Sequence, residues 1–294
     1  MMAEAAREAK VITTVVEMQA WAERHRAQRR TIGFVPTMGF LHEGHLELMR
    51  IARERADEVV TSIFVNPKQF GPSEDLAAYP RDFERDKRMC ESVGVDLIFN
   101  PAPEEIYPAG YQTQITVPQV ASALCGASRP VHFGGVATVC CKLFNAVRPH
   151  FAVFGEKDYQ QILVVERMAE DLHLGLEIVH GATVRESDGL AMSSRNVYMT
   201  PEQRAQAPII RKALTHAKTL VDGGECASNT ILAAVREMLA GAPEGRIDYV
   251  DLRALPNLEE AKEYPAGPHL LAVAVYFGKS RLIDNQVLSF AIPN

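Results

Sequence analysis

The chain has 294 residues, of which 47% are hydrophobic and 23% charged, so it can build one large core or two ordinary ones. Its net charge of −6 disfavours a general nucleic-acid binder, and no apolar run approaches the ~20 residues that a membrane span requires. Five cysteines form no CxxC pair, and the N-terminus lacks the apolar core of a secretory signal. These features predict reduced packing cysteines in a cytoplasmic protein.

The first part of the chain alternates between amphipathic segments and short apolar runs. A helix over 13–29 is followed by a strand at 32–35, a helix at 45–56, a strand at 58–65, a helix at 82–94, a strand at 95–100, a helix at 134–147, a strand at 151–154, a helix at 159–172 and a strand at 176–181. Continuous apolar strands that alternate with helices are typical of a parallel sheet covered on both faces. We therefore predict an α/β domain with a doubly wound, Rossmann-like parallel sheet over residues 1–184.

The rhythm changes near residue 184, where a polar stretch with an Asp-Gly turn begins. Thr200 and Gln203 can form a capping box around Pro201, which favours a helix start there, and Pro208 is expected to break or kink that helix before Gly223. A helix at 228–240 follows, and then strands at 246–252, 269–277 and 286–290. This order has no strand–helix alternation and predicts a second, smaller α+β domain over residues 185–294.

Four polar loops directly follow predicted strands of the first domain. They read PTMGFLHEGH, NPKQFGPSEDLAAYPRD, GEKD and VRESDGLAMSSRN. Ligands of an open parallel sheet bind beyond the carboxyl ends of its strands, so we expect these loops to converge on one crevice.

His42 and His45 stand where the first strand hands over to a helix, and three interpretations are open. A zinc-protease helix places its histidines four apart, whereas these are three apart with Gly44 between them, which disfavours zinc. Two surface histidines without a role are the second possibility. The third, which we favour, is phosphate binding, because Gly39 and Gly44 allow close approach of the backbone and a helix N-terminus presents N–H groups to an anion.

Six segments in this order resemble the pantoate–β-alanine ligase family, which lies within the HxGH nucleotidylyltransferase superfamily. They are PTMGFLHEGH, FVNPKQF, YPR, RPVHFGGVATV, FGEKDYQQ and DGLAMSSRN, and they span roughly residues 32–200. The resemblance implies that ATP and (R)-pantoate form an enzyme-bound pantoyl-adenylate and pyrophosphate, with Mg²⁺ present. β-Alanine then displaces AMP to give pantothenate. It also implies a homodimer and a smaller domain that closes over the nucleotide.

The resemblance also assigns roles to individual residues. His45 matches the proton donor, His42 its phosphate-contacting partner, and Lys157 a further catalytic residue, while Gln69 and Gln161 match the pantoate-binding glutamines, Gln69 lying also near β-alanine. The positions that match ATP-binding segments are Pro36, Thr37, Met38, Gly39, Phe40, Leu41, His42, Glu43, Gly44, His45, Gly155, Glu156, Lys157, Asp158, Val184, Met192, Ser193, Ser194 and Arg195. The metal ligands are not assigned.

These residue types suit the implied chemistry, because the pantoate carboxylate is itself the nucleophile. Neutral glutamines can bind it without the ion pair that would weaken its negative charge. Two positions depart from the family pattern: Phe40 stands where a small residue is usual, and Lys68 stands where threonine or an apolar residue is frequent. Asp86 is available as a magnesium ligand, but the neighbouring Arg85 and Met89 are not carboxylates.

Two other functions remain open at this point. A nucleotidylyltransferase of the same superfamily would need a basic pocket for a substrate phosphate, whereas NPKQF and DYQQ offer amides. A nucleotide-sensing module without catalysis would not need His42, His45 and Lys157 together. We expect no nucleic acid and no membrane among the partners, only pantoate, β-alanine and ATP.

Overall fold

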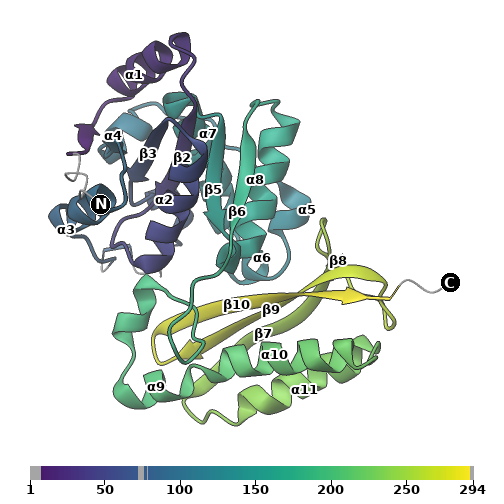
Figure 1. The fold of residues 1–294 in the computed structure, drawn as a ribbon. Coiled ribbons are helices and arrows are strands. Elements are labelled where there is room, and N and C mark those ends of the chain that lie inside the picture. The colour runs from purple at the N-terminus through teal and green to yellow at the C-terminus, as the bar shows by residue number, and fades with distance from the viewer. Residues whose placement is uncertain (1–7, 72–75, 78, 292–294) are drawn as a thin grey trace. The chain divides into compact units, whose positions relative to one another are not determined.

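The computed structural model describes residues 8–71, 76–77 and 79–291. The contacts between residues divide the chain into two compact units. Figure 1 labels the helices and strands of each unit. Unit 1 comprises the described residues up to Ala121 together with Arg129–Glu156 and Gln161–Ala182. Unit 2 comprises Ser122–Ser128, Lys157–Gln160 and the described residues from Thr183 onward. Among these residues, no helix has the length and apolar character needed to cross a bilayer.

Unit 1 contains a six-stranded sheet in the order β1-β4-β3-β2-β5-β6, and all of its pairings are parallel. The strands are β1 (Lys10–Ile12), β2 (Ile32–Thr37), β3 (Glu58–Ile63), β4 (Leu97–Phe99), β5 (Phe151–Gly155) and β6 (Glu177–Gly181). The prediction of a doubly wound parallel sheet is confirmed. The chain winds outward from β2 in one direction and from β5 in the other, so the topological switch point lies between these two neighbours.

The helices of unit 1 cover both faces of this sheet. The longer ones are α1 (Val15–Ala27), α2 (Glu43–Arg55), α3 (Phe83–Ser92), α7 (His132–Val147) and α8 (Tyr159–Asp171), and the short α4 (Pro103–Ile106) and α5 (Pro118–Ala121) lie between α3 and α7 in the chain. Alternate residues of β2 face opposite layers: Val35 packs in the core with α2 and α3, whereas the Phe34 ring meets Phe144 of α7 edge to face. This alternation is what two covered faces require.

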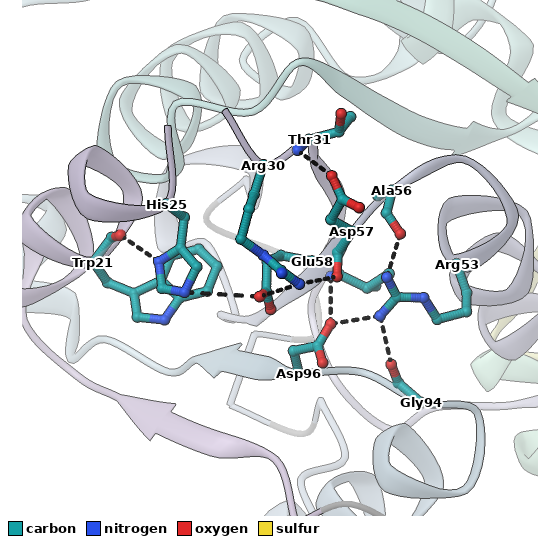
Figure 2. A network of polar contacts seen from close by, with 11 residues as sticks. Trp21, His25, Arg30, Thr31, Arg53, Ala56, Asp57, Glu58, Gly94 and Asp96 are labelled. Carbon is teal, nitrogen blue, oxygen red and sulfur yellow. Dashed lines mark hydrogen bonds and ion pairs between the residues drawn. The ribbon is translucent and has the colours of Figure 1, made fainter. Parts of the chain in front are cut away.

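The amino ends of the strands carry a network of charged side chains (Figure 2). Glu58, at the start of β3, is buried and accepts a hydrogen bond from Arg30 at 2.8 Å. Asp96, just before β4, accepts the N–H of Val59 at 2.8 Å and pairs with Arg53 at 2.5 Å. These side chains pair with one another and with the backbone N–H of Val59 at the amino ends of the strands. The polar loops leave the opposite, carboxyl ends of the strands. We therefore assign this network to stability and not to the functional site.

Unit 2 is built on an antiparallel sheet in the order β10-β9-β7-β8. Its strands are β7 (Gly245–Ala254), β8 (Glu259–Glu260), β9 (Gly267–Phe277) and β10 (Ser280–Phe290), and its helices are α6 (Cys125–Ser128), α9 (Pro201–Gln206), α10 (Ile209–Asp222) and α11 (Ser228–Ala240). α10 and α11 lie along one face of this sheet and share its hydrophobic core (Figure 1).

Two sequence predictions for this part of the chain are confirmed and one is wrong. Thr200 caps α9 through the expected capping box with Gln203, and the helix breaks at Pro208 before α10. The last strand begins at Ser280 and not at residue 286, because the polar stretch before 286 pairs in full with β9. Outside unit 2, the three-residue β1 was not predicted either.

Candidate active site

The first polar loop leaves the carboxyl end of β2 and turns sharply before α2. Thr37 Oγ1 donates to the carbonyl of Ser62 at 2.6 Å and accepts the N–H of Gly39 at 3.3 Å. Gly39 and Phe40 both have positive φ, at +78° and +50°. Glycine adopts this left-handed conformation at little cost, but phenylalanine does not, so its surroundings must hold the turn at Phe40.

The two histidines of this loop lie at the amino terminus of α2. His42 is the extended N-cap residue, and His45 is the third residue of the 13-residue helix. The N–H of His42 donates to Nδ1 of His45 at 3.2 Å, and the ring centroids lie 4.0 Å apart. A helix N-terminus favours an anion, and two imidazoles on its first turn add hydrogen-bonding groups for one.

Gln69 follows β3 in a 3₁₀ turn, η1 (Pro67–Gln69), and its neighbour Asn66 is almost fully buried. Asn66 Oδ1 accepts the N–H of Lys68 at 3.2 Å and the hydroxyl of Tyr107 at 2.7 Å, while Asn66 Nδ2 donates to the carbonyl of Gly135 at 3.1 Å. A backbone N–H can only donate and a carbonyl can only accept. Both ends of the Asn66 amide are therefore fixed by unambiguous partners.

Asn66 in turn fixes the amide of Gln69. Its Nδ2 also donates to Gln69 at 3.0 Å, so the receiving atom must be Oε1, and the Nε2 of Gln69 is left as a donor. This Nε2 lies 3.2 Å from the sulfur of Met38, which is a weak acceptor. A hydroxyl or carboxylate oxygen of a ligand is a better acceptor than a thioether. Beside the histidine loop, Gln69 thus presents an oriented, uncharged donor.

Helix α7 packs closely against the backbone of the η1 turn. A Cβ on Gly135 would lie 2.4 Å from the carbonyl oxygen of Lys68, so only glycine permits the observed approach of the two backbones. The carbonyl of Gln69 contacts Nδ1 of His132 at 3.0 Å and Nη2 of Arg129 at 3.4 Å. The RPVHFGG segment therefore fixes the main chain at Gln69.

Lys157 lies in η2 (Glu156–Asp158), directly after β5, and its side chain is about four-fifths buried, with Nζ 3.4 Å from Asp158. The side chain of Asn285 on β10 donates to the carbonyl of Lys157 at 3.0 Å. Gln161 lies in the first turn of α8 and is half-buried. Asn285 thus anchors the backbone from which the Lys157 ammonium extends.

The segment 184–195 forms a small hairpin followed by a 3₁₀ turn, η3 (Ser194–Tyr198). The N–H of Met192 donates to the carbonyl of Val184 at 3.0 Å, which closes the hairpin. Ser193 is the N-cap of η3 and accepts the N–H of Arg195 at 3.2 Å, and the hydroxyl of Ser280 donates to the carbonyl of Arg195 at 3.2 Å. Local capping and β10 therefore fix the backbone at Ser193–Arg195.

Further contacts fix the hairpin between Val184 and Met192. Arg185 makes a two-pronged ion pair with the buried Asp284 of β10, at 2.6 and 3.0 Å. Asn196 Nδ2 donates to Glu186 at 2.8 Å. These contacts make the hairpin a defined structure and not a loose loop.

The four polar loops contain no cysteine, and Cys90 and Cys140 lie on α3 and α7. Burial raises the pKa of the Cys90 thiol and of the Cys140 thiol to about 12. Within the described ranges, no group of three or more His, Cys, Asp and Glu side chains could hold a metal ion.

The structure places the sequence-predicted residues in two sets. In unit 1 the loop 36–45 and Gln69 meet through Met38, and Gly155 and Glu156 end β5. In unit 2, Lys157 and Arg195 are both anchored by β10. The sequence gives no local sign of the roles of Asn66 and Asn285, because both depend on partners far away in the chain.

Comparison with known proteins shows the family to which the chain belongs. Residues 10–287 match the family model described as pantoate-beta-alanine ligase. The chain is 54% identical over 278 residues to the pantothenate synthetase of Pelotomaculum thermopropionicum, covering 95% of this chain and 98% of that protein. The pantothenate synthetase of Syntrophobacter fumaroxidans is also 54% identical, over 279 residues, with the same coverage.

Solved structures give the same result. A crystal structure of pantothenate synthetase from Thermus thermophilus has a TM-score of 0.88 at 46% identity and covers 94% of this chain and 98% of its own. The pantoate-beta-alanine ligase of Francisella tularensis, in complex with beta-gamma ATP and beta-alanine, has a TM-score of 0.78 at 31% identity and covers 95% and 97% of the two chains.

Proposed function

The chain belongs to the pantoate–β-alanine ligase family, and from this premise we propose that it condenses (R)-pantoate with β-alanine through a pantoyl-adenylate intermediate. The pantoate carboxylate attacks the α-phosphorus of ATP, and pyrophosphate leaves. The amine of β-alanine then attacks the acyl carbon, and AMP leaves with the carboxylate oxygen that it gained. Both steps use nucleophiles that the substrates bring, so no acyl- or phosphoryl-enzyme is required.

In unit 1, the loop 36–45 binds the phosphates of ATP. His42 and His45 hydrogen-bond the phosphate oxygens, and His45 donates its hydrogen bond to an oxygen on which charge develops during adenylation. Gln69 and Gln161 bind pantoate. The orientation of the Gln69 amide supports this assignment, because its donor suits a pantoate oxygen and carries no charge that would quench the attacking carboxylate.

In unit 2, Lys157 stabilises negative charge on the phosphates, and Ser193, Ser194 and Arg195 contact the nucleotide together with the backbone at Val184 and Met192. These assignments rest on the family resemblance. Asn285 donates to the carbonyl of Lys157, and Ser280 donates to the carbonyl of Arg195. These contacts support a defined placement of the Lys157 ammonium and of the neighbouring serine hydroxyls.

Magnesium is proposed as a partner of ATP and not as a resident ion of the protein. Asp86, the available carboxylate, accepts backbone N–H groups with both oxygens, and the described residues contain no group of three or more His, Cys, Asp and Glu side chains that could hold a metal ion. Magnesium usually keeps several waters and binds through substrate phosphates. A homodimer, which the resemblance implies, and a cytoplasmic location, which the cysteine pattern predicts, complete the proposal.

The observation that carries this proposal is the fixed Gln69 donor next to the histidine loop. It supports an uncharged contact to a substrate oxygen beside the proposed phosphate-binding loop. Exchange of labelled pyrophosphate into ATP tests it, since adenylation is reversible before the amine arrives. Exchange should require pantoate but not β-alanine. Exchange that appears only with β-alanine would contradict the two-step order, and exchange with a phosphorylated substrate in place of pantoate would indicate a nucleotidylyltransferase.

A further inference from the structure

One buried carboxylate holds the turn that leads to the two histidines. Asp86 lies in the first turn of α3 and is 1% exposed. Its Oδ2 accepts the N–H of Phe40 at 2.7 Å, and its Oδ1 accepts the N–H of Leu41 at 2.8 Å. Two consecutive backbone donors are thus satisfied by one side chain. Charge-assisted hydrogen bonds of this kind are roughly twice as strong as neutral ones.

The turn at this point needs such support. Gly39 and Phe40 are successive residues with φ of +78° and +50°, and this left-handed conformation is unfavourable for a residue with a Cβ such as Phe40. The contact is close, because a Cβ on Gly39 would lie 3.0 Å from Oδ2 of Asp86. A backbone in this conformation persists only where its surroundings determine it.

Arg85, next to Asp86 in the chain, contacts the side chain of Phe40. Its guanidinium carbon lies 5.3 Å from the centroid of the Phe40 ring, within the range of a cation–π contact. Arg85 Nη1 also lies 3.5 Å from Oδ1 of Asp86. Phe40 and Arg85 are thus linked in space, and the large ring at position 40 has a partner in this chain.

The turn determines how the next residues are presented. The side chain of Leu41 is buried in the core under α2, and the N–H of His42 then donates to Nδ1 of His45. A change in the backbone at Phe40 or Leu41 is therefore expected to displace the N–H of His42, which donates to His45. Positional errors of about 1 Å at a reacting group can reduce a rate about 10²-fold.

We propose that Arg85 and Asp86 form a clamp on the Gly39–Leu41 turn, with Asp86 as a positioning residue that places His42 and His45 for adenylation. The inference rests on the proposed role of His45. Asp86 touches no reacting atom and acts through the backbone of the loop.

The test is a double-mutant cycle on pyrophosphate–ATP exchange, with Asp86→Asn, His45→Ala and the double variant. Asparagine keeps the shape but presents an NH₂ group to one of the two backbone donors. We expect Asp86→Asn to lower the exchange rate about 10- to 10²-fold. Formation of pantothenate from supplied pantoyl-adenylate and β-alanine should change less than threefold. In the His45→Ala background the same substitution should cost less than threefold, because the group that it positions is gone.

Asp82→Asn is the matched control. Asp82 is the exposed N-cap of α3 and accepts the N–H of Arg85, a role that asparagine fills equally well. It should leave both half-reactions unchanged.

Arg85→Ala gives a second route if Asp86→Asn does not fold, because it leaves the buried carboxylate in place. It should slow exchange several-fold in the parent and have no effect in a Phe40→Ala background. Each variant is checked for its melting temperature.

The outcomes separate the inference from the proposed function. Normal exchange in His45→Ala would refute the role of His45 and our inference with it. A large loss in His45→Ala with a fully additive loss in the double variant would leave the proposed function standing and overturn the clamp. Equal losses in both half-reactions of Asp86→Asn would also overturn it, since they would indicate a general structural effect.

Discussion

The backbone N–H of His42 donates to Nδ1 of His45 over 3.2 Å. Since a backbone N–H can only donate, Nδ1 of His45 must carry a lone pair, and the neutral ring holds its proton on Nε2. The helix thus fixes a tautomer whose Nε2–H is a donor that suits a phosphate oxygen. The proposed role of His45 depends on this relationship.

His45→Ala should lower kcat by about 10²–10³, the usual loss on removing one donor to developing charge. The KM for ATP should change much less, because the bond strengthens mainly in the transition state. Steady-state kinetics measure both. His216→Ala, on the exposed surface of α10, is the control and should be neutral. A raised KM with normal kcat would make His45 a ground-state binding residue.

Asn66→Asp should raise the KM for pantoate and destabilise the fold by about 1–3 kcal/mol. The carboxylate cannot donate to Gly135 or to Gln69, so the Gln69 amide loses its fixed orientation. Pantoate kinetics and chemical denaturation measure the two effects. Asn145→Asp, at an exposed position of α7, makes the same chemical change and should have neither effect. An unchanged pantoate KM in Asn66→Asp would refute the orienting role.

Gly135→Ala should destabilise the protein by about 1–3 kcal/mol, because the new methyl group would overlap the backbone at Lys68. Gly134→Ala is a matched control on the same helix, since its Cβ would lie 3.0 Å from the end of the Gln114 side chain and 3.7 Å, an ordinary contact distance, from the carbonyl oxygen of Ile115. Thermal unfolding compares the two variants. Equal melting temperatures would show that the close approach of α7 to η1 is not required.

Alkylation with iodoacetamide near neutral pH should leave the activity intact. Burial raises the pKa of the Cys90 and Cys140 thiols to about 12, so few thiolates exist there to react. Cys226 is exposed and should react first. Peptide mapping locates the label, and a turnover assay follows it. Loss of activity in step with modification of any one cysteine would indicate a thiol function that the structure does not suggest.

The sequence was sufficient for the parallel sheet, because runs such as residues 58–65 are rich in β-branched and apolar residues and alternate with helices, which is typical of a sheet covered on both faces. It was insufficient for β10, where Arg281, Asp284 and Asn285 interrupt the apolar pattern. In the structure these polar side chains contact Asp248, Arg185 and Lys157, so their strand position reflects tertiary partners.

The site shows the same division. The histidines, Gln69 and Lys157 stand out by residue type and by their place after strands. Asn66 and Asp86 do not, because their roles come from backbone groups that the fold brings to them, at Gly135 and at Phe40–Leu41. No local pattern encodes such a contact.

In the proposed reaction the pantoate carboxylate is the nucleophile, and the protein forms no covalent intermediate. Pantoate labelled with ¹⁸O in its carboxylate tests it most directly. Attack on the α-phosphorus makes an anhydride whose bridging oxygen came from pantoate, and the amine of β-alanine then breaks the bond between acyl carbon and oxygen. Mass spectrometry should find one labelled oxygen in the phosphate of AMP. Unlabelled AMP, or an acylated or phosphorylated protein trapped without β-alanine, would contradict the account.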